Sequence, residues 1–194
     1  MTLNDSWGYQ KSDNAWKTPE TVIKNLVTCA GGGGNYLLNI GPKPDGTVPE
    51  ESVQVLEATG KWLDHNGDAV YNTERGHLEG TAFSNCSRKG NTLYINVFYW
   101  PGNTPAQQWL SFYQPPSAVA VGGLTAKVKS ARLLNGGKPV KFEQDQFSVR
   151  FTGLPATAPD SPCTVIAAEC ESEPTVDSNA IRSEWPRYGV GVKG

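Results

Sequence analysis

The chain has 194 residues, 38% of them hydrophobic, which is enough for one or two domains with a buried core. Its 17 Lys and Arg residues are balanced by 19 Asp and Glu residues, and no basic run stands out, so we expect no nucleic-acid partner. No apolar stretch reaches the roughly 18 residues of a membrane-spanning helix. Residues 1–12 are polar and carry no hydrophobic signal region. We therefore expect no membrane partner and no signal peptide.

The spacing of the cysteines and histidines does not indicate a metal site or a redox-active cysteine pair. His65 and His77 are the only histidines, and no C-x-x-C pair is present. We expect no metal site and no cofactor. Free, mostly buried thiols are a better interpretation of the scattered cysteines than a disulfide framework. These cysteines are Cys29, Cys86, Cys163 and Cys170.

Residues 18–34 carry the signals of a helix that ends at a glycine run. Thr18 is a capping residue type, and Pro19 suits the first helical position. Apolar residues then recur at helical spacing up to Ala30. The pattern predicts a helix from Pro19 to the glycines at 31–34.

A second helix and two short strands complete the first part of the chain. Pro49 and the acidic residues after it open the helix, and Asn66 with Gly67 ends it. Residues 6–9 and 35–40 are typical of short strands. Strand and helix then alternate twice, as in a parallel α/β sheet or barrel. The face of the second helix is marked by Val53, Leu56, Gly60 and Leu63.

The period of the sequence changes to two near residue 76. Short strands separated by Gly, Pro, Asn and Ser clusters indicate an antiparallel β-sandwich. The fold class is therefore α/β plus all-β. We expect a partial (β/α) barrel-like segment at 1–73, a β-sandwich at 74–171 and a polar tail at 172–194. The candidate strands are Thr81–Cys86, Thr92–Tyr99, Gln107–Phe112, Val128–Leu134, Lys138–Phe142, Phe147–Phe151 and Thr164–Glu171.

Several segments together resemble the end of the catalytic barrel of glycoside hydrolase family 29, the α-L-fucosidases. The resemblance is ordered over residues 3–73, and residues 74–171 fit the β-sandwich that follows that barrel. It implies retaining hydrolysis of terminal α-L-fucose from a fucosylated glycan or fucoside, without a cofactor. Family members are often secreted, periplasmic or lysosomal, and the location of this chain stays open. The matching segments are Ser6–Tyr9, Gly33–Pro42, Asp45–Gly46, Gly60–Leu63 and Asn66–Tyr71.

The same resemblance implies that the family's aspartate nucleophile and glutamate acid/base belong to sequence before Met1. We therefore expect the chain to lack both. Trp7, Tyr9 and Asn39 would lie at the ends of late barrel strands and approach the sugar pocket, because barrel active sites form there. The alternative is that Trp7 and Tyr9 pack between barrel and helices.

Three functional hypotheses remain open from the sequence. The first is a non-catalytic or weakly active relative of the α-L-fucosidases. The second is a small active fucosidase with Asp5, Asp13 or Asp45 as catalytic carboxylates. The third is a carbohydrate-binding sandwich with an aromatic face, although core packing is the commoner role of such rings. Those aromatic residues are Phe98, Tyr99, Trp100, Trp109 and Tyr113.

An incomplete barrel also leaves strand edges and helix faces bare. We expect such a chain to cover them by packing its α/β part on the sandwich, by self-association, or within a longer parent chain.

Overall fold

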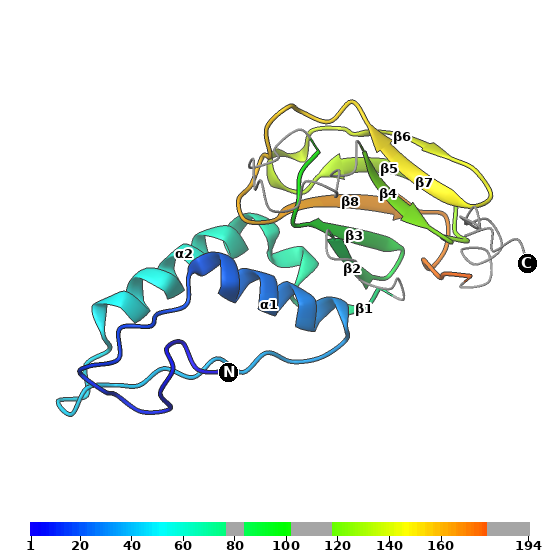
Figure 1. Cartoon of the computed structure of the whole chain (residues 1–194). Coiled ribbons are helices and arrows are strands. Elements are labelled where there is room, and N and C mark those ends of the chain that lie inside the picture. Colours follow the sequence, from blue (N-terminus) through cyan, green and yellow to red (C-terminus); the bar gives the residue numbers. More distant parts are fainter. Residues whose placement is uncertain (77–83, 102–117, 178–194) are drawn as a thin grey trace, which may run out of the picture.

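The computed structural model describes residues 1–76, 84–101 and 118–177, and these form two antiparallel sheets with two helices on one side (Figure 1). The prediction of an antiparallel all-β part is confirmed. Predicted strand Gln107–Phe112, Trp109, Tyr113 and residues 178–194 lie outside the described residues.

Both helices begin and end where the sequence predicts. Helix α1 spans Pro19–Gly31, and the side chain of Thr18 accepts a hydrogen bond from the Thr21 amide at 3.3 Å. Helix α2 spans Glu50–Asn66, with acidic residues in its first turn. These residues complement the positive end of the helix dipole. A short 3-10 turn, Gly67–Ala69, follows α2.

The buried face of α2 differs from the predicted one. Leu56 is 40% exposed, whereas the neighbouring stripe is buried. The large ring of Trp62 determines which face of α2 is buried, because the ring can leave solvent only if its own side of the helix faces the sheet. A buried indole N–H also needs a hydrogen-bond partner. The stripe consists of Ser52, Val55, Thr59, Trp62 and Asn66.

Among the described residues, eight strands form the two sheets, and every pairing of strands within each sheet is antiparallel. The larger sheet has the order β1-β2-β3-β8-β5 and the smaller one β4-β7-β6. Strand bounds are β1 Glu74–Arg75, β2 Ser84–Lys89, β3 Thr92–Val97, β4 Val119–Gly122, β5 Val128–Leu133, β6 Lys141–Gln144, β7 Ser148–Thr152 and β8 Thr164–Cys170. A 3-10 turn, Asn135–Gly137, follows β5.

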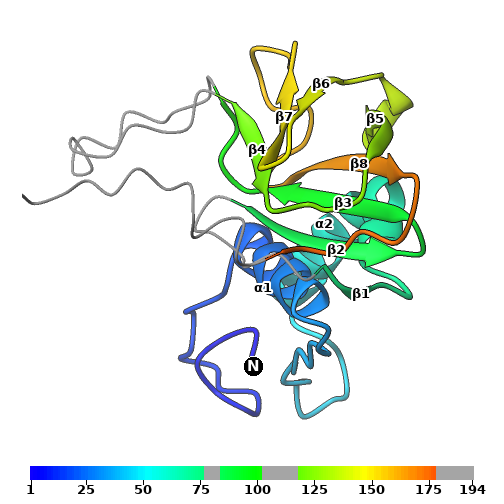
Figure 2. The same ribbon diagram turned by 90° about the vertical axis from the view of Figure 1, so that its right-hand side faces the viewer.

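The main core lies between the two sheets, which face each other as in a sandwich (Figure 2). Ile95 and Ile166 from the larger sheet and Phe151 from the smaller one are fully buried there. Successive side chains of a strand point to opposite faces of the sheet, so every second residue of a strand can reach this core.

The helices cover the outer face of the larger sheet. Ile23 of α1 and Trp62 of α2 pack with Val165 of β8 in a second buried cluster. The Trp62 indole also donates a hydrogen bond to the Cys163 carbonyl at 2.9 Å. The α1, α2 and sheet layers are therefore held together by one continuous set of contacts.

Most strand predictions hold within a few residues. Strands β3, β5, β7 and β8 start at, or one residue after, the predicted positions. Strand β6 begins at Lys141 rather than Lys138, because Asn135–Gly137 forms a 3-10 turn and Pro139 cannot donate to a ladder. The sequence did not predict β1, which has two residues, or β4, which has four.

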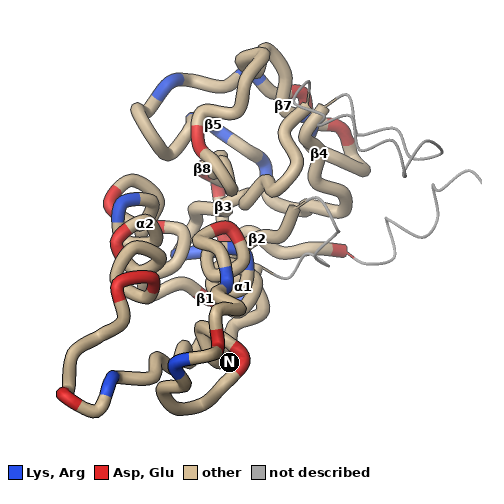
Figure 3. Tube along the Cα trace, turned by 60° about the vertical axis from the view of Figure 1, so that its left-hand side comes forward, with Lys and Arg blue, Asp and Glu red and all other residues tan. Residues whose placement is uncertain are grey.

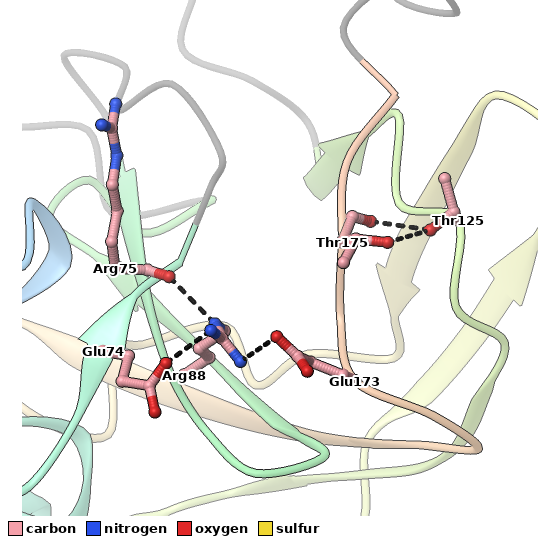
Figure 4. A network of polar contacts seen from close by, with 6 residues as sticks. All are labelled: Glu74, Arg75, Arg88, Thr125, Glu173 and Thr175. Atoms are coloured by element: carbon pink, nitrogen blue, oxygen red, sulfur yellow. Dashed lines mark hydrogen bonds and ion pairs between the residues drawn. The ribbon is translucent and has the colours of Figure 1, made fainter.

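Arg88 of β2 joins three segments at the edge of the larger sheet (Figure 4). Its guanidinium pairs with the carboxylates of Glu74 and Glu173, and its Nε donates to the Arg75 carbonyl at 3.2 Å. The Arg88 side chain is only 12% exposed. Residues 171–177 run beside residues 123–127, where the amide of Thr125 donates to the Thr175 carbonyl at 3.0 Å. Arg88 thus ties this last described segment to β1 and β2.

We expect Arg88→Met to lower the free energy of unfolding by about 1–2 kcal/mol, because the Arg75 carbonyl loses its hydrogen-bond donor and the last described segment loses its ion pair to β2. Urea unfolding would measure this. The matched control is Lys89→Met, an exposed neighbour on the same strand, which should change stability by less than about 0.5 kcal/mol. Equal effects of the two substitutions would contradict the role of Arg88.

Candidate functional site

Two segments near the N-terminus pair in parallel. Thr2 and Asn39 form a parallel bridge. The Leu3 amide donates to the Asn39 carbonyl and the Asn39 amide to the Met1 carbonyl, both at 2.9 Å. The predicted strand at 35–40 is thus reduced to this short pairing.

The predicted strand at Ser6–Tyr9 is wrong, because this segment is an irregular bend. The Ser6 amide donates to the Asp13 carboxylate at 2.9 Å instead of to a neighbouring strand. Residues 1–3 make the strand-like contact in its place.

Trp7 and Asn39, both predicted to approach a sugar, are brought together by the fold. The Asn39 side-chain amide donates to the Trp7 carbonyl at 2.7 Å. The Trp7 ring itself is 70% exposed, and Tyr9 is half-buried. Gly41 lies against the backbone of Gly8 and Tyr9, where a Cβ would come within 2.7 Å of backbone atoms. Only glycine allows this approach.

Asp13 holds a local loop in place. Its carboxylate accepts the Ser6 amide at 2.9 Å and the Ala15 amide at 3.1 Å. Hydrogen bonds from the Ser6 side chain and then from the Ala15 amide lower the pKa of Asp13. A carboxylate held ionised in this way is unsuited to be a general acid, whose pKa must be raised toward the working pH.

Asp45 does the same for a different turn. It accepts the Thr47 amide at 3.0 Å and the Thr47 hydroxyl at 2.7 Å. These hydrogen bonds, that of the amide first, lower the pKa of the exposed Asp45 carboxyl. Asp5 is exposed on the segment before Ser6. The described contacts of Asp13 and Asp45 are therefore those of turn-forming acids.

The aromatic residues of the sandwich divide between core and surface. Trp100 is 4% exposed and its indole donates to the Pro155 carbonyl at 2.8 Å, so it belongs to the core. Tyr99 is 45% exposed and Phe98 is partly buried. The Lys24 ammonium of α1 lies 5.4 Å from the Phe98 ring centre and 5.8 Å from that of Tyr99. These two rings already have a cationic partner within the chain.

Asn4 is a buried polar residue for which the sequence predicts no place in the site. Its side chain is 3% exposed, and its Oδ1 atom has no hydrogen-bond partner. Its carbonyl accepts the Lys17 ammonium at 3.0 Å. The burial of Asn4 is visible only in the structure, because nothing in the neighbouring sequence indicates that this asparagine is buried.

The described residues contain no group of three or more His, Cys, Asp or Glu that could hold a metal ion. In the same part of the chain, no helix is long and apolar enough to cross a membrane. All four cysteines are free thiols. Burial raises the pKa of Cys86 to about 12, so this thiol stays protonated at neutral pH. Acidic and basic residues are interspersed along the chain (Figure 3).

Comparison with known proteins supports the family resemblance. Residues 1–68 match the family model of the α-L-fucosidases. Tissue α-L-fucosidase of Mus musculus is 38% identical over 104 residues, which are 50% of this chain and 23% of the mouse enzyme.

Solved structures extend the similarity over most of the chain. α-L-Fucosidase isoenzyme 1 of Paenibacillus thiaminolyticus superposes with a TM-score of 0.74 and 31% identity, covering 89% of this chain and 39% of that one. A family-29 α-L-fucosidase of Bacteroides thetaiotaomicron, trapped as a covalent intermediate with 2-fluoro-fucosyl fluoride, has a TM-score of 0.72 and 27% identity, covering 89% and 37%.

The chain thus spans between about a quarter and two-fifths of the length of these relatives. The family match, the identity and the shared fold agree with one another and with the motifs in the sequence. Over the matched residues, the chain is a relative of the α-L-fucosidases of glycoside hydrolase family 29.

Proposed function

We propose that this chain forms the β-sandwich of a family-29 α-L-fucosidase together with an adjoining part of its catalytic barrel. Residues 1–73 are the barrel-derived segment, 74–171 the sandwich and 172–194 a polar tail. The order of elements along the chain supports this proposal. The strand-like residues 1–3 are followed by helix α1, and residues 37–39, which pair in parallel with residues 1–3, are followed by helix α2. That β-α-β-α order is the repeating unit of a (β/α) barrel.

The chain alone does not hydrolyse α-L-fucosides. Retaining hydrolysis needs two carboxyl groups across the scissile bond, one of them able to donate a proton. The observation that carries this proposal is the engagement of Asp13 and Asp45 in their own turns, with lowered pKa values. Neither of these carboxyl groups is suited to supply that proton.

The barrel-derived segment contributes to the rim of a fucose site in the complete enzyme. Trp7 exposes an aromatic face on which the apolar face of a sugar can stack. Asn39 fixes the backbone of Trp7 through the Trp7 carbonyl. Trp7, Tyr9 and Asn39 are therefore assigned to positioning a fucosylated glycan or fucoside, and the catalytic carboxylates to a part of the enzyme outside this chain.

Release of nitrophenol from a nitrophenyl α-L-fucoside by the purified chain tests the catalytic proposal. The expected rate equals that of a buffer blank, and Asp5→Asn, Asp13→Asn and Asp45→Asn leave it unchanged. Turnover that one of these substitutions abolishes would overturn the proposal in favour of a small active fucosidase. Turnover that survives all three would overturn it as well, once a mock purification excludes a contaminating enzyme.

A further inference from the structure

The sandwich has a cavity of its own, between the start of β5 and the end of β6. Its volume is about 580 Å³, and its lining residues all come from the stretch 124–171. The turn from β6 to β7 forms one wall, and this turn lies at the opposite end of the sandwich from α2 (Figure 1). A volume of this size is typical of small-molecule sites. The cavity is therefore separate from the barrel-derived segment and from Trp7.

One wall of the cavity is held in shape by Gln144. Its Oε1 atom accepts the Val128 amide at 2.9 Å, and its Nε2 atom donates to the Ala126 carbonyl at 3.0 Å. The Glu171 amide donates to the Lys127 carbonyl of the same stretch at 2.8 Å. Both β6 and the end of β8 thus fix this stretch of backbone. The cavity is therefore preformed, as most ligand sites are.

The floor of the cavity is apolar. Leu124 is 5% exposed, and the partly buried Val128 and Phe142 pack against the main core. Phe142 therefore lines the cavity with an aromatic ring whose position the core fixes. Aromatic rings of this kind offer a flat apolar surface on which a ligand can pack.

The rim of the cavity carries charges of both signs, on exposed Lys127, Asp145 and Glu171. The Asp145 carboxylate is held in place, because its Oδ1 atom accepts the Phe147 amide at 2.7 Å and the Ser148 amide at 2.8 Å. These hydrogen bonds, that of Phe147 first, lower the pKa of Asp145, so the group is ionised at neutral pH. A carboxylate has about four acceptor positions, so capacity remains for a ligand.

An aromatic ring beside two acceptors and one cationic donor fits a neutral, polyhydroxylated ligand. Sugar hydroxyls donate to carboxylates and accept from an ammonium group, while the C–H face of a pyranose packs on an aromatic ring. An anionic ligand fits less well, because the rim has two acids and one base. We propose that this cavity is a second saccharide site, which binds a pyranose unit of a neutral glycan. The choice of a glycan rests on the proposed function, whereas the cavity does not.

Amide NMR spectra of the isotope-labelled full chain, titrated with lactose, test this site. Lactose is neutral and contains no fucose, so its binding does not depend on a fucose pocket. We expect saturable shifts of the backbone amides at residues 126–128 and 145–148. Asp145→Asn should raise the dissociation constant about tenfold, because asparagine can keep the turn but loses the charged acceptor. Phe142→Leu should weaken binding similarly, because it keeps an apolar side chain and removes the ring.

Glu143→Gln is the matched control for Asp145→Asn. Glu143 is exposed on β6 next to Phe142 but does not line the cavity, so its substitution should leave the dissociation constant unchanged. Equal affinity of wild type and Asp145→Asn would overturn the site. So would the absence of saturable shifts up to about 50 mM lactose, or shifts confined to residues 1–9 and 37–41.

Glycylglycine, a zwitterion without a sugar ring, is the control ligand. If it shifts the same amides as lactose with equal affinity, the charges of the rim account for binding and the saccharide site is overturned. The titration and the fucoside assay fail independently. A flat titration removes this site and leaves the proposed function standing, whereas fucoside turnover by the chain overturns the proposed function and leaves lactose binding at this cavity in place.

Discussion

Trp62→Ala is expected to lower the free energy of unfolding by about 3–5 kcal/mol, the largest effect of any substitution considered for this chain. The Trp62 ring is 5% exposed and sits between α2 and the outer face of the larger sheet. Its removal opens a cavity there. The Cys163 carbonyl also loses the indole N–H that it accepts at 2.9 Å. Urea unfolding followed by circular dichroism would measure the change.

Trp62→Phe separates the two contributions of this residue. It retains an aromatic ring of smaller size and removes the hydrogen bond, so we expect a loss of about 1–2 kcal/mol. If Trp62→Ala unfolds at the same urea concentration as the wild type, the packing of α2 on β8 is not what stabilises the chain.

Gly41→Ala is expected to lower the free energy of unfolding by about 2–3 kcal/mol, because the added methyl group has no room. A Cβ at Gly41 would lie 2.7 Å from the Gly8 carbonyl carbon and from the Tyr9 amide nitrogen. Both are backbone atoms, so a side-chain rotation cannot relieve the clash. The segment must move, and the Asn39 hydrogen bond to Trp7 is lost. Thermal unfolding measures the change in stability.

Gly60→Ala is the matched control for Gly41→Ala. Gly60 lies inside α2, where a Cβ meets nothing within 4 Å. Alanine has the higher helix propensity, so this substitution should raise stability by up to about 1 kcal/mol. Opposite signs at the two glycines are expected. A Gly41→Ala variant as stable as the wild type would contradict the close approach of the two segments.

The helices were predictable because their end signals are local. Thr18 and Pro19 mark the start of α1 within two residues, and Asn66 with Gly67 marks the end of α2. The buried face of α2 was not predictable in the same way. Val53 and Leu56 form a plausible apolar stripe, but the stripe through Trp62 is the one that meets β8. That choice depends on a contact with residue 163, about a hundred positions away in the chain.

The N-terminal site shows the same limit. The motif at Ser6–Tyr9 indicates the family correctly, but its conformation depends on Asp13, which draws the Ser6 amide into a loop. The placement of Trp7 beside Asn39 depends in turn on Gly41, which lets the two backbones approach. Burial of Asn4 also has no local signal, because Asn4 directly follows residues 1–3, whose pairing with residues 37–39 is not visible in the sequence.

The most direct measurement of whether the chain holds a catalytic nucleophile is its intact mass after incubation with 2-fluoro-fucosyl fluoride, the compound in the trapped Bacteroides thetaiotaomicron structure. A retaining enzyme forms a covalent bond between the sugar and a carboxylate. We predict that the chain keeps its mass of 20.9 kDa, while a full-length family-29 enzyme treated in parallel gains one fluorofucosyl unit. A stoichiometric gain of one fluorofucosyl unit on this chain, mapped by peptide analysis to one of its own carboxylates, would contradict the proposal that its catalytic carboxylates lie elsewhere.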